Sequence, residues 1–95
     1  MSQIRFNPEG LSAASTNLKN YAGELEGLIG KMQNVVSGLP DCWEGAASTA
    51  YVQQFTDLKP GLDKTKELIE TIAKQIDQTL RAAQELDTKI AGHFK

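Results

Sequence analysis

The chain has 95 residues, a length that limits it to one domain with little core of its own. Its net charge is −2. Its single cysteine, Cys42, excludes an intrachain disulfide, and Cys42 with the single histidine, His93, makes a poor zinc site within one chain. Charges of both signs are scattered without a basic stripe, so we expect no nucleic-acid partner. We also expect no cofactor. Since a chain this short has neither a disulfide nor a metal site to stabilise it, we expect self-association through apolar surface.

Residues 1–10 contain no apolar stretch of the roughly 7–15 residues that a signal peptide requires. Nor does the sequence contain a run of about 18 apolar residues anywhere, as a membrane-spanning helix would need. We therefore expect no cleavable signal peptide and no stable membrane insertion. Recognition by other means is required if the protein leaves the cell.

The first predicted helix covers about residues 8–39. Asn7 suits an N-cap, Pro8 the first helical position, and Glu9 the positive end of the helix dipole. Apolar residues then recur in alternating steps of three and four, a period of 3.5 residues that is typical of a coiled-coil-like seam. They are Leu11, Ala14, Leu18, Tyr21, Leu25, Leu28, Met32, Val35 and Leu39. A flanking stripe consists of Ala22, Ile29 and Val36.

The predicted turn covers about residues 40–46, after Gly38 and Pro40 end the first helix. A connection this short makes the two helices antiparallel. It contains the only tryptophan, Trp43, followed by Gly45, which lets the chain bend. Two compatible roles are open for Trp43: its ring covers the end of the helix bundle, or it is an exposed binding anchor.

The second predicted helix covers about residues 47–92, with a kink near Pro60 because the apolar stripe keeps its phase there. Thr65 lies within this stripe and is expected to bond to a carbonyl of its own helix. We also expect i,i+4 ion pairs of Glu70 with Lys74 and of Asp77 with Arg81. The stripe runs through Tyr51, Phe55, Leu58, Leu62, Thr65, Ile69, Ile72, Ile76, Thr79, Ala83, Leu86, Ile90 and His93.

A lone hairpin would leave both stripes in water, well beyond the few hundred Å² of apolar patch that a typical monomer exposes. Two hairpins packed face to face would bury them. The predicted fold class is therefore all-α: residues 1–95 form one antiparallel helix-turn-helix hairpin that dimerises into a four-helix bundle. The predicted dimer seam consists of Leu11, Leu18, Leu25, Leu28, Met32, Phe55, Leu62, Ile69, Ile72 and Ile76.

The run Trp43-Glu44-Gly45, placed mid-chain between two amphipathic helices in about a hundred residues, resembles the WXG family of early-secreted-antigen-like proteins. The Pro8-Glu9 opening and the Phe55…Leu58-x-Pro60 segment extend the resemblance over essentially the whole chain. It implies export by the type VII (ESX) secretion system of Gram-positive and actinobacterial cells. It also implies pairing with itself or with a paralogous WXG protein, and binding to the secretion ATPase.

The resemblance further implies a composite export signal, in which Trp43 and Gly45 of one protomer lie beside the C-terminal motif of the other. That motif falls on Ala83, Asp87, Ile90 and Phe94, which share one helix face. Ala83 is smaller than the family pattern expects, and no tyrosine follows Tyr51, so the match is closer to the homodimeric Gram-positive type. Apart from the resemblance, an ordinary solvated charge accounts for Asp87.

Function is therefore expected to consist in binding and export, with no catalytic residues, because nothing suggests a nucleophile, base and orienting group held together. The leading hypothesis is a protein secreted as a homodimer, acting as an effector or an export carrier. The alternative is a cytoplasmic helical adaptor that pairs with a larger helical type VII substrate. A membrane-active role is disfavoured because the second helix mixes charges and has no Lys/Arg-rich face.

Overall fold

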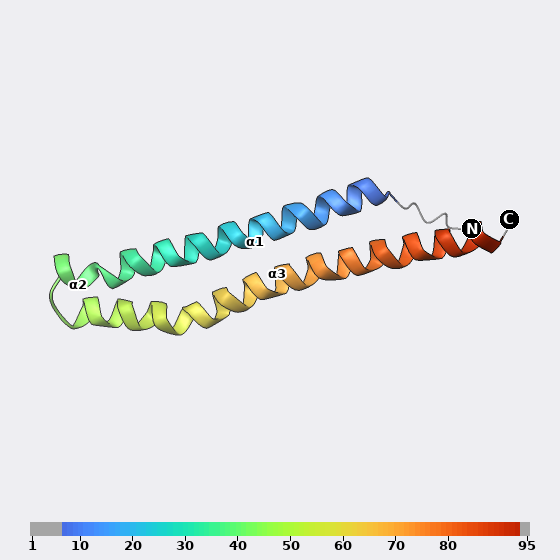
Figure 1. Cartoon of the computed structure of the whole chain (residues 1–95). Helices are drawn as coiled ribbons and strands as arrows, with labels where there is room; N and C mark the ends of the chain where they lie inside the picture. The colour runs from blue at the N-terminus through green and yellow to red at the C-terminus, as the bar shows by residue number, and fades with distance from the viewer. Residues whose placement is uncertain (1–6, 94–95) are drawn as a thin grey trace, which may run out of the picture.

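A computed structural model of the chain describes the backbone of residues 7–93 and the side chains of residues 7–85. It contains α1 (Pro8–Ser37), α2 (Leu39–Cys42) and α3 (Ala46–His93), and no strand within residues 7–93. Helices α1 and α3 lie side by side and antiparallel, giving a rod of 76 × 21 × 19 Å (Figure 1). The predicted all-α hairpin is confirmed.

Both ends of α1 are closed by local hydrogen bonds. At its start the Asn7 side chain accepts a hydrogen bond of 3.0 Å from the Gly10 amide, as predicted for an N-cap. At its end the Gly38 amide donates to the carbonyls of Asn34 and Val35, at 3.1 and 3.2 Å. The one-turn helix α2 then occupies the beginning of the connection to α3.

Helix α3 continues through Pro60 instead of ending there. Proline has no amide proton, so one backbone hydrogen bond of the helix is missing, and Figure 1 shows α3 changing direction in its yellow part. One turn later the Thr65 hydroxyl donates to the Gly61 carbonyl at 3.0 Å, as the sequence predicted.

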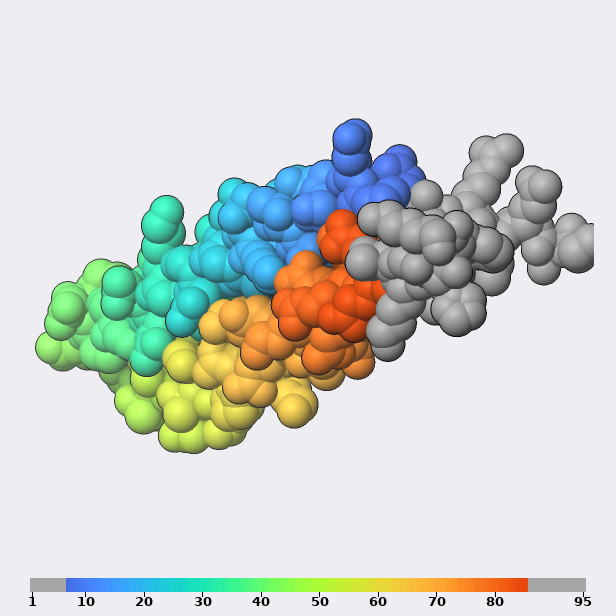
Figure 2. All heavy atoms as spheres, turned by 45° about the vertical axis from the view of Figure 1, so that its right-hand side comes forward, coloured from blue at the N-terminus to red at the C-terminus, as the bar shows by residue number. Residues whose placement is uncertain are grey.

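The contact between α1 and α3 is built mainly from small side chains. Ser15 donates from its hydroxyl to the Ala73 carbonyl at 3.2 Å, which ties the two helices together inside the contact. Small residues let helix backbones approach closely, and Figure 2 shows the atoms of α1 and α3 packed against each other. We call the fully buried residues of this contact the inner seam: Ser15, Ala22, Ile29, Ser48 and Ala73.

One side of this contact is bridged by ion pairs between the helices. Lys19 Nζ lies 2.6 Å from Asp77 Oδ2, and Lys66 Nζ lies 3.4 Å from Glu26 Oε2 on the other helix. Lys66 also pairs with Glu70 of its own helix, at 3.2 Å. We call these five residues the polar flank. Of the predicted i,i+4 neighbours, Arg81 acts on Asp77 only through its charge, and the cations in contact with Asp77 and Glu70 are instead Lys19, across the hairpin, and Lys66, from the preceding turn.

Candidate partner-binding surface

The opposite side of the hairpin carries large apolar side chains that the chain does not cover. Their exposed fractions lie between 41 and 70%. Such values are unusual for a whole row of large apolar residues, although single exposed ones are common. We call this row the apolar flank: Tyr21, Leu28, Met32, Val35, Leu58 and Ile72.

Helix geometry explains why the two flanks are separate. Leu28 immediately precedes the buried Ile29, and Ile72 immediately precedes the buried Ala73, so each is turned about 100° from the inner seam. Glu26 lies three residues before Ile29 and is turned to the other side by about 60°. Antiparallel helices place equivalent positions on the same side of their contact. The hairpin is therefore a ribbon with one charged and one apolar side.

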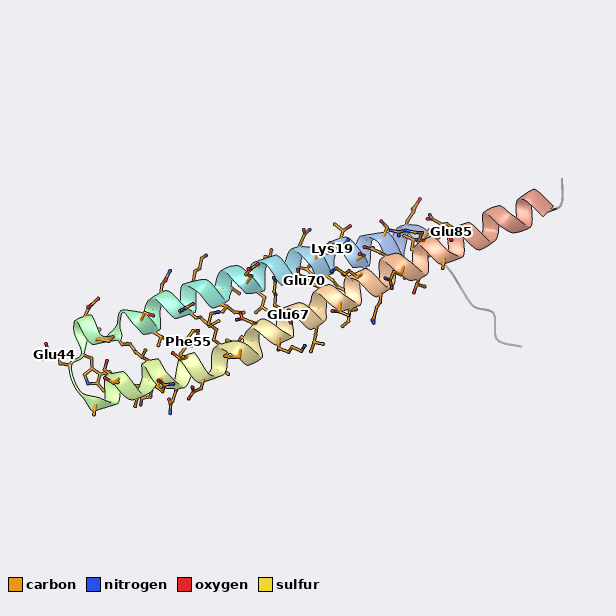
Figure 3. All side chains as sticks on the ribbon, turned by 60° about the horizontal axis from the view of Figure 1, so that its bottom comes forward. Lys19, Glu44, Phe55, Glu67, Glu70 and Glu85 are labelled. Carbon is orange, nitrogen blue, oxygen red and sulfur yellow. The ribbon has the colours of Figure 1, made fainter. Side chains whose placement is uncertain are left out.

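A groove deepens the apolar flank near the turn end of the rod. It has a volume of about 440 Å³, and among the described residues Lys31 is the only charged one that lines it. Figure 3 shows Phe55 between the ribbons of α1 and α3 at this level. The other lining residues are all apolar: Leu28, Met32, Val35, Val36, Phe55, Leu58 and Leu62.

The hairpin fully buries none of the ten residues that the sequence assigned to the dimer seam. Leu28, Met32 and Ile72 are exposed. The other seven are half-buried at the border between inner seam and apolar flank: Leu11, Leu18, Leu25, Phe55, Leu62, Ile69 and Ile76. The inner seam instead uses Ala22 and Ile29 of the flanking stripe, with Ser15, Ser48 and Ala73. Sequence reasoning missed these three because small and hydroxyl side chains give no apolar signal.

The Trp-x-Gly turn forms one end of the rod. Trp43 packs against Tyr51 with ring centroids 5.5 Å apart and planes tilted by 40°, and both side chains stay almost half-exposed. The Trp43 amide donates to the Leu39 carbonyl at 2.9 Å. Gly45 has a φ of 135°, which only glycine adopts readily. Cys42 is exposed.

The C-terminal motif lies at the other end of the rod (Figure 1). Ala83 is half-buried on α3, and the backbones of Asp87 and Ile90 continue the same helix. The side chains of Asp87 and Ile90, and all of Phe94, lie outside the described residues. A single chain therefore does not bring Trp43 and Gly45 together with this motif.

Two side chains of the polar flank have shifted pKa values, and their ion pairs cause both shifts. A hydrogen bond from Lys19, whose charge acts in the same direction, lowers the pKa of Asp77 below its ordinary 3.8. The hydrogen bond to Glu70, helped by the charge of Glu26, raises the pKa of Lys66 above its ordinary 10.5. Both groups are held in their charged forms at neutral pH.

These features define a class of protein: a helical hairpin with a Trp-x-Gly turn and one apolar side, whose described helices are each too short or too polar to cross a membrane. A family model described as proteins of 100 residues with WXG matches residues 3–88. The chain belongs to this family, WXG100.

Several known proteins are similar over nearly their full length. Protein YukE of Bacillus subtilis is 30% identical, over 97% of this chain and 95% of its own. Type VII secretion system extracellular protein A of Staphylococcus aureus is 27% identical, over 99% of this chain and 97% of its own.

Solved structures have the same fold. EsxA of Geobacillus thermodenitrificans superposes with a TM-score of 0.83 and 25% identity, covering 94% of this chain and 98% of its own. The secreted protein EsxB of Bacillus anthracis has a TM-score of 0.79 and 24% identity, covering 92% of this chain and 99% of its own. At that identity EsxB supports the fold alone.

Proposed function

We propose that this chain is a non-enzymatic protein secreted through the type VII system, and that it travels as an antiparallel homodimer. Membership of the WXG100 family supports the pathway, as does similarity to a relative named as an extracellular protein of that system. In the dimer two apolar flanks face each other and form a four-helix bundle. The protein then acts outside the cell as an effector, or carries a partner during export.

The apolar flank is the observation that carries this proposal. A surface of six large apolar residues on one side of a narrow rod is stable in water only when another surface covers it. A second copy offers the same row and the same groove, which an isologous two-fold interface requires. The polar flank stays in water because its carboxylates and amines already pair with one another.

The antiparallel arrangement also assembles the export signal. One chain holds its turn and its C-terminal motif at opposite ends of the rod. Turning the second copy end for end places Trp43 and Gly45 of one protomer at the level of the other protomer's Ala83, Asp87, Ile90 and Phe94. The secretion ATPase then binds a surface to which both protomers contribute, so that export selects the assembled dimer.

Truncation after Leu86 tests this proposal. It removes Asp87, Ile90 and Phe94 but leaves the inner seam and the apolar flank intact. We expect a folded dimer by circular dichroism and light scattering, and no protein in the culture medium. A chain that lacks only Lys95 is the matched control and should be exported. Appearance of the truncated protein in the medium at the control level would overturn the assignment of the signal.

The groove also supports a second candidate function. An apolar groove of about 440 Å³ next to an exposed helix row also suits a helix of a larger protein. In that case the chain is a cytoplasmic adaptor for a larger helical type VII substrate. Light scattering separates the two functions, because an adaptor without its substrate would be a sticky or poorly folded monomer, whereas the secreted homodimer is stable alone.

A further inference from the structure

The tip of the hairpin presents two aromatic rings to solvent. Trp43 is 43% exposed and Tyr51 is 49% exposed, although their rings pack against each other at 5.5 Å. The two rings therefore pack against each other and still leave ring surface free. A half-exposed aromatic surface is the kind of site on which a cation or another planar group stacks.

The charge around these rings has one sign. No lysine or arginine occurs between Lys31 and Lys59, whereas Asp41, Glu44 and Asp57 lie within this stretch. Asp57 accepts a hydrogen bond from Gln53 at 2.9 Å. Asp41 and Glu44 are exposed and form no ion pair with any described residue, and Figure 3 shows Glu44 at the extreme end of the rod, pointing away from it.

Other charges do not neutralise this tip. Lys59 is paired with Asp63 at 2.9 Å, and Lys31 lines the groove on α1. The end of α1 and the start of α3 lie here together, so their partial dipole charges oppose each other and largely cancel. The sign of the potential at the tip is therefore set by the two unpaired carboxylates.

We propose that the Trp43–Tyr51 tip binds a cationic segment of the export machinery, with an arginine side chain on the aromatic rings and beside Asp41 and Glu44. Arginine fits best because its planar guanidinium stacks on aromatic rings and also pairs with carboxylates. A second copy brings its Arg81 and Lys89 to this end together with Glu85 and Asp87, so it adds no net charge to the tip. This inference rests on the proposed function and specifies the chemistry of its partner.

Trp43 fluorescence tests the inference directly, because Trp43 is the only tryptophan in the chain. The probe is a capped peptide, Gly-Ser-Arg-Arg-Ser-Gly, titrated into the full-length protein at low salt. The control peptide carries citrulline, a neutral analogue of the same shape, in place of both arginines. We expect a saturable change of Trp43 emission with the arginine peptide, and binding at least about ten-fold weaker with the citrulline peptide.

Two double variants distinguish the effect of the charge at the tip from the effect of the net charge of the protein. Asp41→Asn with Glu44→Gln should weaken binding of the arginine peptide at least about five-fold. Glu24→Gln with Glu67→Gln changes the net charge equally at exposed sites along the middle of the rod, away from the tip, and should leave binding unchanged. Raising the salt from about 50 to about 500 mM should weaken wild-type binding. No emission change, equal binding of the citrulline peptide, or equal weakening in both double variants would overturn the inference.

Export and dimerisation distinguish this inference from the proposed function. The Asp41→Asn/Glu44→Gln variant should remain a dimer and reach the medium in reduced amount. If this variant is exported like wild type while truncation after Leu86 still abolishes export, the cationic partner is wrong and the proposed function stands. If the wild-type protein neither dimerises nor reaches the medium, the proposed function itself fails, whatever the peptide does.

Discussion

Lys19 and Asp77 join the two long helices of the hairpin, with Nζ and Oδ2 only 2.6 Å apart across 58 residues of sequence. This ion pair lowers the pKa of Asp77 below its ordinary 3.8. The carboxylate therefore stabilises the fold at every pH above its ordinary pKa. That contribution is lost only as the pH falls from about 4 through the lowered pKa of the folded state.

The first prediction concerns acid. Urea unfolding of wild type should show no loss of stability from Asp77 between pH 7 and pH 5, and a loss below about pH 4. Asp77→Asn should lower the urea midpoint at pH 7 and reduce its dependence on pH in acid, so that variant and wild type converge once the pH falls below the lowered pKa of Asp77 in the folded state. Glu85→Gln is a matched control at an exposed carboxylate. Equal midpoints of Asp77→Asn and wild type at pH 7 would show that the pair does not stabilise the hairpin.

The second prediction compares two glycines. A Cβ atom at Gly45 or at Gly27 would meet no atom within 4 Å, so only backbone conformation distinguishes the two sites. At Gly45 the φ of 135° is strained for alanine, and Gly45→Ala should lower the unfolding free energy by about 1–3 kcal/mol. Gly27 is helical, and Gly27→Ala should raise it by about 0.5–1 kcal/mol. Urea unfolding at one protein concentration measures both, and changes of the same sign would refute the account of the turn.

The third prediction tests the inner seam. Ala73 is fully buried, and its carbonyl accepts the Ser15 hydroxyl. Ala73→Leu should therefore force α1 and α3 apart and destabilise the fold by about 1–3 kcal/mol. Ala82→Leu, at an exposed position of α3, should change stability by less than about 0.5 kcal/mol. Thermal unfolding followed by circular dichroism compares them, and equal melting temperatures would mean that the helices are not in close contact at Ala73.

The sequence predicted much of this fold because its signals are local. A 3.5-residue period, the Asn7 cap and the short Trp-x-Gly connection together specify two antiparallel helices. They also placed Leu28, Met32 and Ile72 in the seam, and the hairpin leaves these three exposed. Their role in a dimer remains a prediction.

The features that the sequence did not reveal depend on how α1 and α3 are rotated about their own axes, and therefore on which face of each helix lies in the contact. Ser15 and Ser48 are buried because they face the partner helix at close approach, and hydropathy assigns serine to the surface. The choice of Lys19 over Arg81 as the partner of Asp77 likewise depends on which side of α3 meets α1. Periodicity finds an apolar stripe but does not say which part of it the chain covers by itself.

The fourth prediction concerns the apolar flank. Leu28 is 54% exposed beside the groove, so Leu28→Glu should leave the hairpin folded but bury an unpaired carboxylate in the dimer. We expect the dimer dissociation constant to rise by at least about ten-fold, a change of about 1.4 kcal/mol. Asn20→Glu adds the same charge to α1 at another exposed position and should have no effect. Analytical ultracentrifugation of both variants measures this, and equal dissociation constants would remove Leu28 from the interface.

Sedimentation equilibrium of the wild-type protein at micromolar concentration tests the central claim most directly. The apolar flank requires a cover, so the measured mass should be about twice the 10.4 kDa of one chain and should stay there on dilution into the low micromolar range. A stable, well-folded species of 10.4 kDa would show that one hairpin tolerates its exposed apolar side in water, and would contradict the account.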